Sequence, residues 1–168
     1  TFANESRVGI SELELAAEIE SSMRKAGSGP LAFPLILGSG ARRTSTGVPL
    51  PGNRNLATGD IVLLDCGATY LGYCGDMSRT LVVGIPNDKQ KELLETTLSI
   101  FQNCSESLIP GVTTAEIHSI ATKTAKAAGF DLPFLLGHGI GCQNWEPPFL
   151  SSTDNSSLAA GMVITLEP

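Results

Sequence analysis

The sequence predicts an α+β fold built from two similar halves. Residues 9–27 (GISELELAAEIESSMRKAG) and 111–129 (GVTTAEIHSIATKTAKAAG) share an opening glycine, a hydroxyl residue with a glutamate three positions later, and a closing glycine. A second pair, GDIVLLD at 59–65 and GMVITLE at 161–167, combines a glycine, a buried-strand pattern and a final carboxylate. Both pairs are spaced by 102 residues, which indicates an internal duplication.

The first repeated segment predicts one amphipathic helix in each half. Ser11 with Glu14, and Thr113 with Glu116, match the capping box, in which a hydroxyl and a carboxylate satisfy free N–H groups of the first turn. The closing glycine of each segment suits the position just after a helix end. Apolar residues recur at helical spacing in both segments: Leu13, Ala16, Ala17, Ile19 and Met23, then Ile117, Ile120, Ala121, Ala125 and Ala128.

Strand-like segments follow each predicted helix. LILGSG at 35–40 resembles FLLGHG at 134–139, and each is followed by one of the two glycine-to-carboxylate runs. Asp65 and Glu167 end these runs, so they are expected to occupy equivalent positions in the two halves. The halves are expected to cover about residues 9–83 and 111–168.

In the first half, the chain is expected to form a hairpin that turns near Tyr70-Leu71-Gly72. Asp76 lies on the returning strand, and a turn at this point would place it nearly opposite Asp65. Directly opposed residues have Cβ atoms about 5 Å apart, so two carboxylates there must share a proton or a cation. The duplication predicts a further carboxylate about 102 residues after Asp76, beyond Pro168. The sequence is therefore expected to stop one hairpin short of a complete site.

Composition limits the classes of function. The 168 residues, 42% of them hydrophobic, allow a single domain with a core over 1–168. The net charge is −6 and the 11 basic residues are scattered, so no nucleic-acid partner is expected. No apolar run reaches the roughly 18 residues of a membrane span, so no membrane partner is expected. No signal peptide is visible, and a cytoplasmic location is expected.

Four residues form a candidate metal-binding set. Asp65, Asp76 and Glu167 offer carboxylate oxygens, and His138 offers an imidazole between two glycines that permit close backbone approach. This mostly hard donor set favours Mn²⁺, Co²⁺ or Fe²⁺ over a sulfur-bound zinc ion, and the four cysteines contain no CxxC pair. Several carboxylates around one histidine favour two cations, which about 3.5–4 Å apart can bridge a hydroxide and polarise a carbonyl.

Three motifs extend this interpretation to a known family. LLDCGATYLGYCGDMSRT at 63–80, GHGIG at 137–141 with EPP at 146–148, and GMVITLEP at 161–168 resemble the pita-bread metallopeptidases. That family includes methionine aminopeptidases, Xaa-Pro aminopeptidases and Xaa-Pro dipeptidases, with creatinase as a relative that is not a peptidase. The form GYxxDxxRT at 72–80 favours the Xaa-Pro branch.

The resemblance implies a fold, a metal centre and a reaction. The pita-bread fold has two αβ halves related by a pseudo-twofold axis around an antiparallel sheet. Its dinuclear ligands correspond to Asp65, Asp76, His138 and Glu167, with a last glutamate beyond the chain. A small Xaa-Pro peptide would be attacked by a metal-bound hydroxide, with His138 and Glu167 as catalytic residues and Glu167 as general base. The two ions would be Mn²⁺ or Co²⁺, with Fe²⁺ or Zn²⁺ as alternatives, and a homodimer is compatible with this interpretation.

The sequence departs from the family around the substrate. Family peptidases carry substrate-facing histidines at positions occupied here by Trp145, before EPP, and Phe134, before GHG; a third is absent from the arginine-containing loop at 40–56. Trp145 can stack on a substrate ring or fill the pocket, and filling is favoured. Arg79 can hold the Asp76 carboxylate or form a surface salt bridge. Trp145, Phe134 and Arg79 together form the candidate substrate pocket.

The missing histidines leave two alternative functions open. One is a hydrolase or lyase that uses the same metal ligands on a substrate other than a peptide. The other is a catalytically impaired pita-bread module that binds a partner. Retention of Asp65, Asp76, His138 and Glu167 argues against the binding module, since a drifting pseudoenzyme has no reason to keep metal ligands.

Overall fold

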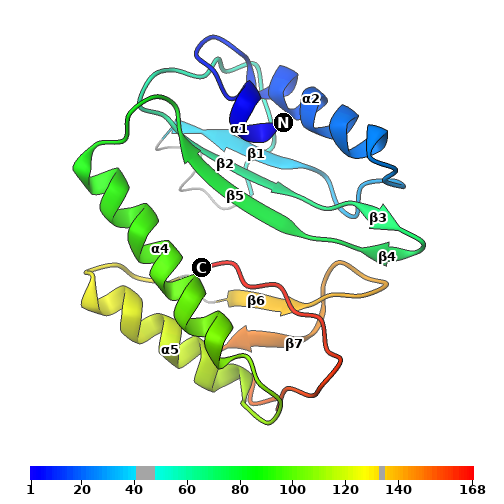
Figure 1. Ribbon diagram of the computed structural model, residues 1–168, viewed down its shortest axis with the longest axis vertical. Coiled ribbons are helices and arrows are strands. Elements are labelled where there is room, and N and C mark those ends of the chain that lie inside the picture. Colours follow the sequence, from blue (N-terminus) through cyan, green and yellow to red (C-terminus); the bar gives the residue numbers. More distant parts are fainter. Residues whose placement is uncertain (41–47, 133–134) are drawn as a thin grey trace. The chain divides into compact units, whose positions relative to one another are not determined.

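The protein, described by a computed structural model over residues 1–40, 48–132 and 135–168, consists of two units, 1–90 and 91–168. Each half of the sequence duplication falls within one unit, and Figure 1 shows the elements of both. Within the described ranges, no helix is long and apolar enough to cross a membrane.

Both predicted capping boxes form, at the N-termini of α2 (Glu12–Lys25) and α5 (Thr114–Ala127). In the first, the N–H of Glu14 donates to Ser11 Oγ at 3.2 Å, and Glu14 Oε2 accepts from the N–H of Ser11 at 2.8 Å. The second box contains the same two hydrogen bonds 102 residues later. Local sequence therefore fixes where each repeated helix begins.

Residues 1–90 contain an antiparallel sheet of order β1-β2-β5, with a short β3–β4 ribbon at the hairpin tip. Strand β2 alternates between buried and half-buried residues, as expected for a strand with one face on a core. The elements of this unit besides α2 are α1 (Phe2–Glu5), β1 (Ile36–Ser39), β2 (Ile61–Cys66), β3 (Thr69–Tyr70), β4 (Tyr73–Cys74) and β5 (Met77–Val82).

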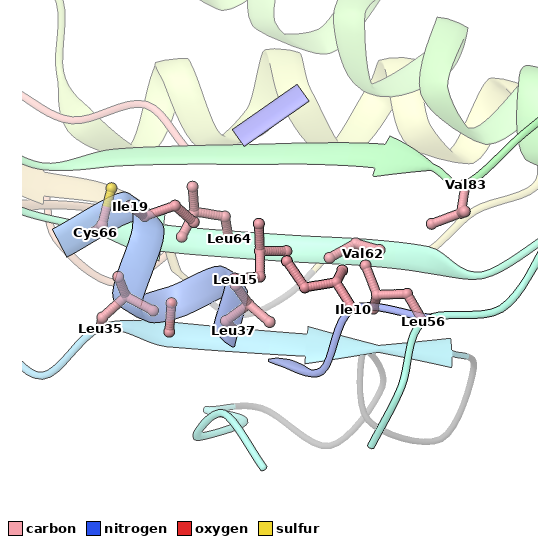
Figure 2. Close-up of a cluster of buried hydrophobic side chains, with 11 residues drawn as sticks. Ile10, Leu15, Ile19, Leu35, Leu37, Leu56, Val62, Leu64, Cys66 and Val83 are labelled. Carbon is pink, nitrogen blue, oxygen red and sulfur yellow. The ribbon is translucent and has the colours of Figure 1, made fainter. Parts of the chain in front are cut away.

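The apolar face of α2 forms one hydrophobic core with the sheet (Figure 2). Leu15 on the helix, Leu37 on β1 and Val62 on β2 are all 0% exposed. Leu64 is 1% exposed and lies on the same face of β2 as Val62. Asp65, next in the chain, therefore points to the opposite face of the sheet, away from this core.

Residues 91–168 form a second core between helices and a two-stranded antiparallel sheet. Ile117 and Ala121 of α5 are fully buried against Leu136 and Leu150. A C-terminal segment runs beside β6 and donates from the N–H of Glu167 to the carbonyl of Leu136 at 2.7 Å. The remaining elements are α4 (Asp88–Ser107), which begins at the end of the first unit, β6 (Leu135–Gly139) and β7 (Glu146–Ser151).

The duplication extends to the hydrogen bonds outside the helices. Gly9 N–H donates to the carbonyl of Leu56 at 2.9 Å, and Gly111 N–H donates to that of Leu158 at 2.8 Å. Leu56 and Leu158 each return a bond, to Ile10 and to its counterpart in the second half. Each unit thus anchors the start of its repeated helix to the turn before its glycine-to-carboxylate segment.

The hairpin in the first half differs from the predicted register by two residues. Tyr70 lies opposite Tyr73, so Leu71 and Gly72 alone make the turn, with φ of 50° and 87°. Asp65 lies opposite Ser78 rather than Asp76. A two-residue turn with positive φ at both positions matches the twist of the strands and fixes this register, which the expected near-opposition of the carboxylates did not take into account.

Candidate metal centre

The first pair of candidate ligands, Asp65 and Asp76, lies on the β2–β5 hairpin of residues 1–90. Because Asp65 faces Ser78, Asp76 is two residues nearer the turn and is a diagonal neighbour of Asp65. Both side chains are half-buried. Oδ1 of Asp65 is shielded from solvent and receives no hydrogen bond from any described residue. A buried carboxylate oxygen without a donor is costly unless a cation or a proton reaches it.

The negative charges of Asp65 and Asp76 affect the neighbouring thiol of Cys66. Burial raises the pKa of Cys66 to about 11, and the charges of Asp65 and Asp76 add to the increase. Cys66 therefore stays protonated at neutral pH, and its side chain points to the core face of β2 with Leu64. On this hairpin, Asp65 and Asp76 offer carboxylate oxygens while Cys66 does not offer a thiolate, and oxygen ligands suit a hard cation.

The second pair, His138 and Glu167, lies in residues 91–168. The backbone N–H of His138 donates to Thr165 Oγ1 at 3.0 Å, and the N–H of Thr165 donates to the carbonyl of His138 at 2.8 Å. These bonds tie β6 to the segment that carries Glu167. The structure therefore holds the backbones of both residues in fixed register before any ligand binds.

The glycines beside His138 have a different role from the one expected. A Cβ at Gly137 would lie 2.1 Å from the carbonyl oxygen of Thr165, and one at Gly139 would lie 2.4 Å from that of Pro147. Close approach is required, but of two neighbouring backbone segments rather than of a ligand. The two glycines let these segments pack closely against β6. His138 lies on this strand and is 2% exposed.

The imidazole of His138 is oriented for a ligand on Nε2. Its Nδ1 is 2.9 Å from the carbonyl oxygen of Gly139, which can only accept, so Nδ1 carries the proton. Nε2 is then an acceptor, and it lies 3.4 Å from Glu167 Oε1. That oxygen is buried and has no hydrogen-bond partner among the described residues. Two acceptors this close need a cation or a further proton between them, and a backbone carbonyl on the other ring nitrogen is the usual partner of a metal-bound histidine.

Both pairs fit divalent cations by the chemistry of their donors. Each unit supplies a shielded carboxylate oxygen, on Asp65 or Glu167, that lacks a hydrogen-bond donor within the described part of the chain. The second unit adds the imidazole of His138, whose Nδ1 lies 2.9 Å from the carbonyl oxygen of Gly139. That these four side chains bind metal remains a prediction from the sequence.

The candidate pocket residues are placed less completely. The Trp145 ring lies 5.3 Å from that of His138, at an interplanar angle of 64°, and the side chain is 55% exposed. Arg79 is exposed, and its Nη1 donates to the carbonyl of Ser78 at 2.7 Å. Phe134 lies outside the described residues. The roles of these three residues remain predictions.

Sequence reasoning did not identify two residues that support His138. Thr165 bonds to its backbone, and Phe149 lies opposite it on β7 and packs against Trp145 at 5.7 Å between ring centroids. Thr165 lies within the strand-like segment and looks like one of its β-branched residues. Phe149 follows two prolines, and no local pattern links it to a residue 11 positions earlier.

Comparisons with known proteins agree on a single family. The profile of metallopeptidase family M24 matches residues 1–168. The Xaa-Pro dipeptidase of Pyrococcus furiosus is 39% identical over 162 residues, which are 95% of this chain and 46% of that protein. The corresponding protein of Pyrococcus horikoshii is 40% identical over 164 residues, with the same coverage. This chain thus spans about half the length of the curated relatives it matches.

Solved structures agree with the family match. The prolidase from Pyrococcus furiosus has a TM-score of 0.92 at 37% identity, covering 98% of this chain and 49% of that one. An X-Pro aminopeptidase from Thermotoga maritima has a TM-score of 0.92 at 32% identity, covering 98% and 47%. These similarities confirm the expected α+β pita-bread fold and the resemblance to the Xaa-Pro branch.

Proposed function

Because the chain belongs to metallopeptidase family M24, we propose that it acts as a divalent-metal-dependent exopeptidase that hydrolyses Xaa-Pro peptide bonds. The observation that carries the proposal is the pair of acceptor atoms, His138 Nε2 and Glu167 Oε1, held 3.4 Å apart with the imidazole anchored through Nδ1. The relatives named Xaa-Pro dipeptidase support the choice of substrate class.

Asp65, Asp76, His138 and Glu167 would together hold the metal. Three carboxylates and a neutral imidazole carry three negative charges, which two divalent cations would offset, and the oxygen-rich set favours Mn²⁺ or Co²⁺. When bound, such ions polarise the scissile carbonyl and lower the pKa of water. The residues contribute fixed positions, since the hairpin register holds the two aspartates and β6 holds the histidine.

Glu167 has a second role in the proposed reaction. Its carboxylate accepts the proton of the attacking water as the water oxygen bonds to the carbonyl carbon. The same carboxylate then gives the proton to the leaving nitrogen of proline as the C–N bond breaks. His138 keeps its ring orientation through Nδ1 and the carbonyl of Gly139, so that Nε2 stays directed at the Glu167 carboxylate.

A second candidate function rests on Trp145. Loss of one group that stabilises the developing oxyanion typically costs about 10²–10³ in rate, and indole replaces imidazole at this position. The same ligand set could then serve a hydrolase or lyase that acts on a substrate other than a peptide. The two functions differ in whether Xaa-Pro dipeptides turn over.

The test is dipeptide hydrolysis by the full chain in the presence of Mn²⁺ or Co²⁺. We expect release of proline from Ala-Pro and Met-Pro, abolished by EDTA and reduced at least 10³-fold in Glu167→Gln. Glu106→Gln, on the exposed surface of α4, is the matched control and should retain full activity. Tight binding of Mn²⁺ by isothermal titration calorimetry without turnover of any Xaa-Pro dipeptide would reject the peptidase and favour the second candidate.

A further inference from the structure

Trp145 is the single tryptophan of the chain and lies directly beside the candidate ligand His138. His138 is 2% exposed, whereas Trp145, whose ring is 5.3 Å away, is 55% exposed. The interplanar angle of 64° is an edge-to-face contact. Trp145 therefore touches the imidazole and still presents much of its surface to solvent. This exposure argues against the expected role of filling a pocket.

The indole is held in place by its surroundings. Its ring packs against Phe149 at 5.7 Å and 61°, and Phe149 is the cross-strand partner of His138. The N–H of Phe149 donates to Asp154 Oδ2 at 2.8 Å, which fixes the strand on that side. In the preceding loop, the N–H of Gln143 donates to Glu146 Oε2 at 3.3 Å. These contacts hold the Trp145 side chain in place, so it loses little conformational entropy when a ligand covers it.

The chemistry of indole limits what this surface can recognise. Its one polar group is an N–H donor that does not ionise near neutral pH, so it cannot act as a general acid or base. Its faces are apolar and electron-rich, and they bind C–H groups and rings through dispersion and burial. An aliphatic ring fits such a surface, whereas a substrate without a side chain would leave it exposed to water.

We propose that Trp145 is a specificity-determining residue that receives the pyrrolidine ring of the substrate beside His138. The inference rests on the proposed function and adds to it a source of selectivity for proline. Selectivity of this kind comes from burial against one aromatic face and appears mainly in KM.

The first test separates proline-containing from proline-free substrates. Kinetics of the Mn²⁺-loaded full chain would be measured with Ala-Pro and Ala-Gly for wild type, Trp145→Phe and Trp145→Ala. Removing the ring should raise KM for Ala-Pro roughly tenfold, with kcat changed less than about threefold and Ala-Gly nearly unaffected. Trp145→Phe should retain most of the preference for proline. Phe101→Ala, which removes an exposed aromatic side chain on α4, is the matched control and should leave the kinetics with both substrates unchanged.

Equal losses on both substrates, or a loss confined to kcat, would overturn the inference while leaving the peptidase intact. A second measurement needs no turnover, because all tryptophan fluorescence comes from Trp145. Titration of the wild type with L-prolinamide should give a saturable change in emission, and glycinamide at equal concentration should give none. If dipeptides are not hydrolysed but prolinamide still perturbs emission, the proposed function fails and the binding role of Trp145 stands. If neither amide changes the emission, the binding role is rejected.

Discussion

At the scale of single residues, His138 and Glu167 are informative because their side chains meet at a shielded position, with His138 Nε2 3.4 Å from Glu167 Oε1. The carbonyl of Gly139 accepts a hydrogen bond from Nδ1–H of His138, and Nε2 lies 3.4 Å from Glu167 Oε1. Neither atom can simply turn away, since both backbones are tied through Thr165 and Leu136. A cation or a proton between these two atoms would stabilise the arrangement.

This arrangement gives different expectations for the stability of the metal-free and the metal-loaded protein. Glu167→Gln can turn an amide N–H toward His138 Nε2, so the metal-free variant should unfold at the same temperature as wild type or slightly higher. The same change removes a charged ligand, so the rise in Tm caused by excess Mn²⁺ should largely disappear. Thermal unfolding with EDTA and with Mn²⁺ measures both effects, with Glu106→Gln as the surface control. Equal Mn²⁺-induced shifts in wild type and Glu167→Gln would show that Glu167 is not a ligand.

At the scale of elements, short-range rules were reliable and long-range pairing was not. The capping boxes depend on side chains three residues apart, so the sequence alone located the starts of α2 and α5. The hairpin depended on which two residues form the turn, and Leu71 adopts a φ of 50° that few residues other than glycine accept. An expectation based on the spacing of the aspartates therefore placed Asp76 where Ser78 lies.

The first capping box also predicts how stability changes with pH. The N–H of Ser11 holds the pKa of the Glu14 carboxyl below its ordinary value of 4.5. A depressed folded-state pKa adds stability above that ordinary value, and this stability is lost as pH falls through the lower, folded-state pKa. Ser11→Ala should lower Tm by about 2–4 °C at pH 7. The difference in Tm between Ser11→Ala and wild type should become smaller as pH falls below 4.5.

Thr113→Ala provides the matched comparison in the second half, because the pKa of Glu116 is lowered by the same contacts. Differential scanning calorimetry from pH 7 to pH 3 would measure both variants. Similar decreases in Tm for Ser11→Ala and Thr113→Ala would show that the two capping boxes contribute similarly to stability. A gap that stays constant over the whole pH range would show that the carboxylates contribute nothing through the two hydroxyls, because the backbone N–H groups of residues 11 and 113 still donate to them in both variants.

At the scale of the whole molecule, the duplication supplied most of what sequence could predict. The spacing of 102 residues anticipated the paired helices and identified Asp65 and Glu167 as corresponding carboxylates. It could not anticipate where the halves differ. Trp145 contacts Phe149 and His138 through strand pairing in the second half, and no periodic pattern encodes such contacts. The sequence could therefore propose the candidate ligands and Trp145, whereas the contacts of Trp145 with His138 and Phe149 required coordinates.

The proposal that both halves serve the same ions can be tested by a double-mutant cycle. Asp65 belongs to residues 1–90 and Glu167 to residues 91–168, so independent sites would lose metal binding independently. If the ions are shared, Asp65→Asn and Glu167→Gln should each weaken Mn²⁺ binding by at least roughly 10–100-fold. The double variant should then bind Mn²⁺ only slightly more weakly than either single variant, because each single substitution already disrupts the shared metal site. Isothermal titration calorimetry measures affinity and stoichiometry together, and Asp131→Asn, on an exposed residue, is the control. Strictly additive losses, with each single variant still binding one ion at wild-type affinity, would mean that each half binds its own cation.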